Sequence, residues 1–179
     1  MFLYETHLHT SPVSICARAS VRENLEFYKR IGYKGVFITN HFIDGYVYTS
    51  STLSYKERID FYFSDYEIAL NLVEKIGIKV FCGIETSYKG AHFLVYGLDK
   101  EWFLENPQIM DMKKKEQLLY FMENGALVIQ AHPFRESVYI DFIRLFPRCV
   151  HGVEVINACN KEEENKILTT IRDNFDLYI

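Results

Sequence analysis

Apolar runs alternate with stretches of helical length along most of this chain, and this alternation limits the possible folds more than any other feature. The runs expected to form strands lie at residues 36–39, 78–81, 126–130 and 150–156, and 177–179 begins one more. The stretches with helical periodicity lie at 21–31, 56–76, 113–124, 139–146 and 161–174. Continuous apolar strands that alternate with helices are typical of a parallel sheet covered by helices. We therefore predict an α/β fold whose sheet is either open or closed into a barrel.

Residues that begin and end helices support these boundaries. Ser20 is expected to cap the first helix, and Glu23, three residues later, completes a capping box. Gly32, Gly77 and Gly125 each stand where a helix is expected to end, as is common for glycine.

One segment interrupts the alternation. Two apolar runs flank Lys89-Gly90, a pair of residues that favours a hairpin turn. The resulting antiparallel strands would place Glu85 and His92 close together. The tyrosine-rich stretch 46–55 is expected to be a surface excursion.

Length and composition predict one packed domain over residues 1–179. The chain has 179 residues and is 49% hydrophobic, which is enough for a sizeable core. Its formal net charge of −4 argues against a general nucleic-acid surface. An anionic substrate is still compatible with this charge, because a bound cation can invert the local field.

The cysteines are scattered and form no Cys-x-x-Cys pair; they are Cys16, Cys82, Cys149 and Cys159. The sequence shows no signal peptide and no apolar stretch of membrane-spanning length. We therefore expect reduced thiols and a cytoplasmic protein that does not bind membranes.

Histidines gather at the expected strand ends and in the hairpin. The candidate ligands are His7, His9, His41, His92, His132 and the carboxylate Glu85. Because the carboxyl ends of the strands form the site-bearing face of α/β folds, these groups should converge. His7 and His9 follow a short apolar run, 1–4, that is expected to be a buried strand, and residues two apart in a strand project from the same face.

Each candidate ligand, taken alone, also has an ordinary structural explanation, but their joint occurrence favours a metal site. Several imidazoles with one carboxylate suit Zn²⁺, Mn²⁺ or Fe²⁺. Glu85 is the expected bridging ligand, because a carboxylate has two oxygens and can bind two cations. His151 lies at the opposite end of its strand and is expected to be structural.

Six motifs occur in a specific order along the chain. They are His7-Leu8-His9-Thr10, Gly35 to His41, Gly83-Ile84-Glu85, His92 to Gly97, Ala131-His132-Pro133 and Gly152 to Asn157. In order and spacing, over essentially the whole chain, they resemble the motifs of the polymerase-and-histidinol-phosphatase (PHP) family. The resemblance implies a distorted, TIM-like β/α barrel of seven strands. It also implies a site with two or three divalent cations that hydrolyses phosphate esters.

The resemblance also implies which residues hold each cation. His7, His9 and Glu85 would bind the first cation. Glu85 would also bind the second, together with His92 and His132.

A third cation would be held by His41, and here the chain departs from the family pattern. The family usually has a further histidine after the first motif, whereas this chain has Cys16 nearby. Cys16 is either a thiolate ligand or a small buried hydrophobic residue. Asn40 replaces the usual aspartate before His41 and is expected to hydrogen-bond an imidazole.

The last family motif is not present in this sequence. Family members end their site with Asp-x-His after the final barrel strand, whereas this sequence ends at residues 176–179. The aspartate would complete the first cation site and the histidine the third. We therefore expect a barrel that is incomplete at its C-terminal side, in a truncated chain or a shortened relative.

The expected function is hydrolysis of a small phosphomonoester by a metal-activated water. Arg18 and Arg135 are the candidates for binding the phosphate oxygens, and their alternative role is to form surface salt bridges. Two other functions are open: an amidohydrolase-type metallohydrolase, and a metal-binding module of the same fold with impaired catalysis. The sequence specifies neither the substrate nor the oligomeric state.

Overall fold

The computed structural model describes residues 2–50 and 52–175. Within them the strands are β1 (Tyr4–Leu8), β2 (Gly35–Ile38), β3 (Lys79–Tyr88), β4 (Ala91–Tyr96), β5 (Leu127–Ala131) and β6 (Gly152–Val153). The α-helices are α1 (Val21–Arg30), α2 (Tyr55–Leu70), α3 (Val73–Ile76), α4 (Lys100–Glu105), α5 (Lys114–Glu123) and α6 (Glu162–Phe175), and a 3₁₀ helix covers Pro107–Met110. The predicted mixture of strands and helices is thus confirmed.

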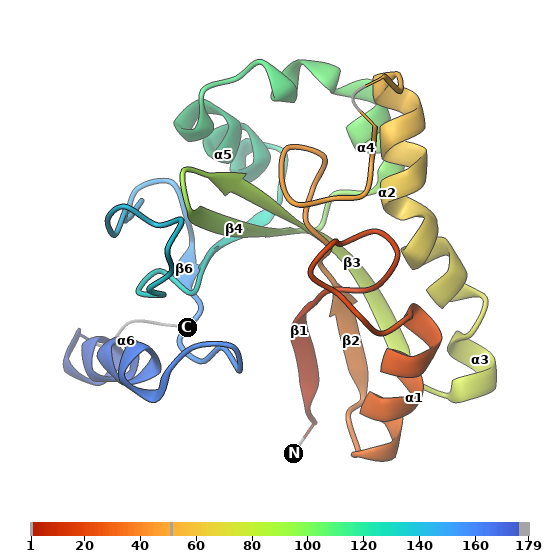
Figure 1. The fold of residues 1–179 in the computed structure, drawn as a ribbon, viewed down its shortest axis with the longest axis horizontal. Helices are drawn as coiled ribbons and strands as arrows, with labels where there is room; N and C mark the ends of the chain where they lie inside the picture. Colours follow the sequence, from red (N-terminus) through yellow and green to blue (C-terminus); the bar gives the residue numbers. More distant parts are fainter. Residues whose placement is uncertain (1, 51, 176–179) are drawn as a thin grey trace.

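The strands form a single curled sheet in the order β1-β2-β3-β4-β5-β6 (Figure 1). Neighbouring strands are parallel except β4, which is antiparallel to both β3 and β5. The curl brings the two edges together, because Nδ1 of His7, on β1, lies 2.9 Å from Oε1 of Glu154, just after β6. The sheet is therefore a half-barrel of six described strands. The strand predicted at 177–179 lies outside the described residues.

The helices lie outside the curl of the sheet (Figure 1). Helices α1, α2 and α3 lie beside β1–β3, whereas α6 lies apart at the β6 edge. The main core is rich in phenylalanine, and Phe42, Phe63, Phe103 and Phe121 are each at most 2% exposed. This packed layer supports the strands whose ends carry the histidines.

Helix ends follow the predicted signals. The side chain of Ser20 caps α1, and the side chain of Glu23 completes the capping box. Gly77 ends α3 in the left-handed conformation, with φ at 72°. The stretch 56–76 is nevertheless two helices, because α2 ends at Leu70 and α3 begins at Val73.

Residues 139–146 form turns and irregular backbone, so the helix predicted there is wrong. The side chain of buried Gln130, on β5, forms hydrogen bonds with two backbone groups of this segment. Its amide donates to the carbonyl of Arg144 at 2.6 Å, and its oxygen accepts from the N–H of Phe146 at 3.1 Å. A side chain of the sheet therefore replaces the helical hydrogen bonds of the segment.

The first strand also begins later than predicted. Strand β1 starts at Tyr4, and Phe2 and Leu3 are exposed rather than buried. The strand predicted over 150–156 pairs only at Gly152–Val153. No helix in the described ranges 2–50 and 52–175 is both long and apolar enough to cross a membrane.

Candidate metal centre

Backbone pairing places His41 and Glu85 side by side. The two residues form an isolated parallel bridge just past the end of β2. The N–H of Glu85 donates to the carbonyl of Asn40 at 3.0 Å, and the N–H of Phe42 donates to the carbonyl of Glu85 at 2.8 Å. The sheet itself therefore fixes the separation between the carboxylate and this imidazole.

Glu85 lies at the centre of the histidine cluster, and its side chain is 1% exposed. Oxygen Oε1 lies 3.2 Å from Nε2 of His7, 3.0 Å from Nδ1 of His92 and 3.4 Å from Nε2 of His132. Oxygen Oε2 lies 3.3 Å from Nε2 of His9 and 2.7 Å from Nδ1 of His41. All six predicted ligands thus converge, and each carboxylate oxygen has its own group of imidazoles. The hairpin prediction for Glu85 and His92 is confirmed.

Most of these separations fit shared cation ligands better than hydrogen bonds. Two donors that are each about 2.1 Å from a tetrahedral Zn²⁺ stand about 3.4 Å apart, whereas N–H···O bonds cluster near 2.9–3.0 Å. Three of the five contacts with Glu85 measure 3.2–3.4 Å. In addition, Nε2 of His7 and Nε2 of His9 face each other at 3.0 Å. The donor set therefore fits divalent cations.

Two buried polar atoms of the cluster lack hydrogen-bond partners among the described residues. They are Nδ1 of His41 and Oε2 of Glu85. They are 2.7 Å apart, but their angles do not meet hydrogen-bond geometry. Unpaired buried polar atoms are costly, and those found in native structures commonly mark the place of an ion or a water.

Cys16 extends the group around Oε2. Donor atoms of His9, Cys16 and His41 all lie within 4.8 Å of one another. Cys16 is exposed, so the alternative that it is a small buried hydrophobic residue is wrong. His7 and His9 lie nearest to different oxygens of Glu85, at 3.2 Å and 3.3 Å.

Burial and the nearby carboxylates shift the pKa values of the cluster in opposite directions. Burial lowers the pKa of His7, but the carboxylates of Glu154 and Glu85, which accept from its ring, outweigh burial and raise that pKa to about 10. For His9, burial dominates and lowers the pKa to about 3, which leaves a neutral imidazole. Burial would raise the pKa of Glu85, but the imidazoles of His132 and His41, which lie 3.4 Å and 2.7 Å from its oxygens, hold that pKa well below its usual range. The buried carboxylates therefore favour cationic partners.

Asn40 supports the site differently from the prediction. Its Oδ1 accepts from Oγ of Ser14 at 2.9 Å, and Oγ of Ser14 contacts Nδ1 of His9 at 3.2 Å. Asn40 thus acts on the imidazole through Ser14. Its Nδ2 donates to Oγ1 of Thr10 at 2.9 Å and faces Oδ2 of buried Asp65 at 3.3 Å. Thr10, Ser14, Asn40 and Asp65 form a buried polar network beneath His9.

Glu154 contacts the histidine cluster, and the site prediction omitted it. Its Oε1 faces Nδ1 of His7 at 2.9 Å, and its Oε2 accepts from the N–H of His132 at 2.9 Å. This second bond helps to hold His132 at a φ of 28°, an unusual value for a residue with a side chain. The signal available in the sequence was a carboxylate at the end of a strand, within the motif that ends at Asn157.

Replacing Glu154 should weaken metal binding. A carboxylate behind a ligating imidazole fixes its orientation and basicity, and losing such a partner typically costs about 10–100-fold in metal affinity. We expect Glu154→Gln to raise the Zn²⁺ dissociation constant by about 10-fold or more, measured by competition with a chromophoric chelator. Glu136→Gln is the control, because Glu136 is exposed and pairs with Lys161. Equal affinities of the two variants would refute a role for Glu154.

The two candidate phosphate-binding arginines differ in how firmly their side chains are held. Nε of Arg135 donates to Asn160 at 2.9 Å, and Nη2 donates to Asn157 at 2.7 Å. Its positive charge also lowers the pKa of His132, after the larger effect of burial. Arg135 is therefore oriented near the cluster, and it belongs to no ion pair in the described part of the chain. Arg18 is exposed, and nothing in that part holds it in an ion pair or hydrogen bond.

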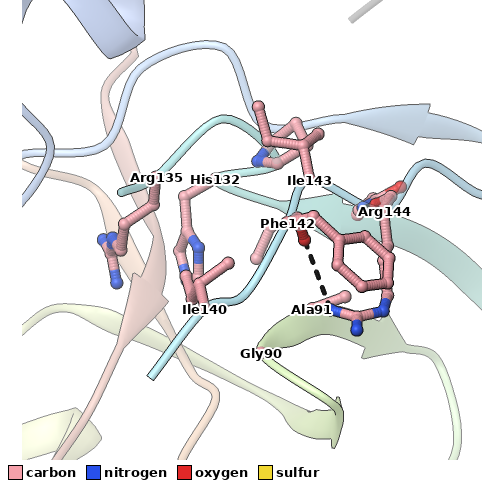
Figure 2. A pocket seen from close by; sticks show the side chains of 11 residues that line it. Gly90, Ala91, His132, Arg135, Ile140, Phe142, Ile143 and Arg144 are labelled. Atoms are coloured by element: carbon pink, nitrogen blue, oxygen red, sulfur yellow. Dashed lines mark hydrogen bonds between the residues drawn. The ribbon is translucent and has the colours of Figure 1, made fainter. Parts of the chain in front are cut away.

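A small pocket opens beside His132 (Figure 2). His132 and Arg135 line one side, whereas Phe142 and Arg144 line the other. The guanidinium of Arg144 lies 3.7 Å from the ring centre of Phe142 and donates to the carbonyl of Lys89 at 2.7 Å. The irregular segment 139–146 therefore forms an apolar wall next to the histidine cluster.

His151 accepts from the N–H of Val128 at 3.0 Å, which is a structural role.

Comparison with known proteins identifies the class of fold. No known family model matches the sequence, and no curated protein matches it. A structure from Bifidobacterium adolescentis, assigned by prediction as a metal-dependent phosphoesterase, matches with a TM-score of 0.61 and 15% identity, over 97% of this chain and 84% of that one. A two-domain protein from Bacteroides vulgatus, with a region assigned by prediction as a PHP-like metal-dependent phosphoesterase, matches with a TM-score of 0.60 and 19% identity.

The second match covers 85% of this chain but 43% of the other protein. At these identities the likeness shows a shared fold.

Proposed function

We propose that this chain is a metal-dependent phosphoesterase that hydrolyses a small phosphomonoester with metal-activated water. The observation that carries the proposal is the convergence of five imidazoles on the two oxygens of buried Glu85. The fold shared with two proteins assigned to this activity supports it. Two divalent cations, chosen from Zn²⁺, Mn²⁺ and Fe²⁺, fit the donor set.

When bound, such cations lower the pKa of a coordinated water toward neutrality and neutralise charge on phosphate oxygens. The residues of the chain hold and orient the site. Glu85 offers one oxygen to each group of imidazoles, and Glu154 fixes the ring of His7 so that Nε2 faces the cluster. The polar network around Asn40 does the same for His9.

Arg135 is the proposed phosphate-binding residue. Two asparagine side chains hold it through Nε and Nη2, so the orientation of its guanidinium is set before substrate binds. Guanidinium groups pair strongly with phosphate oxygens.

Hydrolysis of p-nitrophenyl phosphate tests the proposed function. We expect turnover with added Mn²⁺ or Zn²⁺, none after chelation, and at least about a 100-fold loss in His9→Ala, because the variant lacks a metal ligand. His151→Ala is the matched control, since His151 lies outside the cluster. Equal activity of His9→Ala and the unmodified protein would show that the hydrolysis occurs elsewhere.

A further inference from the structure

We infer that the group around Oε2 of Glu85 is a thiolate-containing cation site that selects Zn²⁺ over Mn²⁺ and Mg²⁺, with Cys16 as its sulfur ligand. The inference rests on the metal-binding part of the proposed function. It adds a donor and a metal preference that do not depend on which ester the site hydrolyses.

The donor atoms of this group lie together. His9, Cys16 and His41 each offer a donor atom within 4.8 Å of the others, and the rings of His9 and His41 have centroids 4.5 Å apart. Oε2 of Glu85 touches both histidines, at 3.3 Å and 2.7 Å. Two nitrogens, one sulfur and one carboxylate oxygen make a four-coordinate set that suits Zn²⁺.

An unpaired buried nitrogen faces this group. The side chain of His41 is 10% exposed, and its Nδ1 has no hydrogen-bond partner within residues 2–50 and 52–175. Oε2 of Glu85, from a side chain that is 1% exposed, is unpaired in the same way. A cation between these atoms would satisfy both at once.

The loop that carries Cys16 is anchored to the same two histidines. Oγ of buried Ser14 accepts from the N–H of His41 at 2.9 Å and contacts Nδ1 of His9 at 3.2 Å. The N–H of Ala17 donates to the carbonyl of Ser14 at 3.1 Å, which closes a turn around Cys16. The sulfur is therefore held near the imidazoles, while its exposure leaves it open to an incoming cation.

The sulfur ligand predicts metal preference. Thiolate ligands favour Zn²⁺ and other soft or borderline cations, whereas Mg²⁺ and Mn²⁺ prefer oxygen ligands. The opposite group, around Oε1, has three imidazoles and no sulfur. The two halves of the centre should therefore differ in the cations that they retain.

Alkylation of the unmodified protein tests the sulfur ligand without any substitution. Iodoacetamide attacks a free thiolate, so Zn²⁺ bound to Cys16 should slow alkylation of its peptide at least about tenfold, whereas Mg²⁺ should not. Cys159 is also exposed and lies outside the donor group, so it is the internal control. Zn²⁺ retention without protection of Cys16 would overturn this inference alone. Retention of Mn²⁺ or Fe²⁺ without Zn²⁺ would likewise overturn this inference alone, whereas retention of none of the three would overturn the proposed function as well.

Cobalt substitution gives a second, spectroscopic readout. Co²⁺ bound to a thiolate shows a charge-transfer band in the near ultraviolet, and we expect this band in the unmodified protein and in Cys159→Ser. Cys16→Ser should lose the band completely while the other half of the centre still binds Co²⁺. A band of undiminished intensity in Cys16→Ser would overturn the assignment of the sulfur.

Discussion

Glu85→Gln should reduce phosphatase activity by at least about 100-fold and prevent stable binding of two cations. The side chain keeps its size, but it loses the negative charge that faces five imidazoles. Losing a partner that only orients a ligand already costs about 10–100-fold, so losing the shared ligand itself should cost more. Hydrolysis of p-nitrophenyl phosphate and metal content after desalting measure the two effects.

Glu67→Gln is the matched control for this substitution. Glu67 lies on α2, its side chain is 53% exposed, and it pairs with Lys100 at 2.7 Å. We expect less than about a twofold change in activity, because exposed ion pairs contribute little. Unfolding curves should show that both variants are folded. Full activity in folded Glu85→Gln would contradict the role of Glu85 as the shared ligand.

Asp65→Ala should have the largest effect on stability among the polar residues near the site. Asp65 is 1% exposed and accepts a hydrogen bond from Oγ1 of Thr10 at 2.7 Å. Its loss leaves buried Thr10 and Asn40 short of a partner, and each unsatisfied buried group costs about 1–3 kcal/mol. We expect a loss of about 3 kcal/mol, which lowers the melting temperature by about 10 °C for a protein of this size.

Asp60→Ala on the same helix is the control. Asp60 is 38% exposed and pairs with Lys56 at 2.6 Å and Lys100 at 2.9 Å. Exposed pairs of this kind contribute about 0–1 kcal/mol. Both variants should be melted with a chelator present, so that bound metal does not add to stability. If Asp65→Ala costs no more than Asp60→Ala, the polar network does not stabilise the fold.

The convergence of the histidines could be predicted because it follows from backbone rules. Parallel strands place their carboxyl ends on one face, and this placed His41 with Glu85 before any side chain was considered. The hairpin at Lys89-Gly90 likewise brought His92 toward Glu85, since its turn residues suit a tight reversal. Both the strand ends and the hairpin can be predicted from the periodicity of the sequence and from its turn residues.

The grouping of the ligands could not be predicted in this way, because it depends on how the side chains are oriented. His7 and His9 project from one face, as expected, yet they contact different oxygens of Glu85. Glu154 contacts His7 across 147 residues of sequence and across the open edges of the sheet, so no spacing rule pointed to it. The segment 139–146 has helical periodicity, but the side chain of buried Gln130 forms hydrogen bonds with two of its backbone groups.

Metal content per chain tests the central claim most directly. The protein would be loaded with Zn²⁺, desalted and analysed for metal by elemental analysis, with Glu85→Gln and Glu67→Gln treated in parallel. Two groups of donors that share one carboxylate predict about two Zn²⁺ per chain in the unmodified protein and in Glu67→Gln, and fewer in Glu85→Gln. Unmodified protein that retains no Zn²⁺, Mn²⁺ or Fe²⁺ would contradict a metal centre at Glu85.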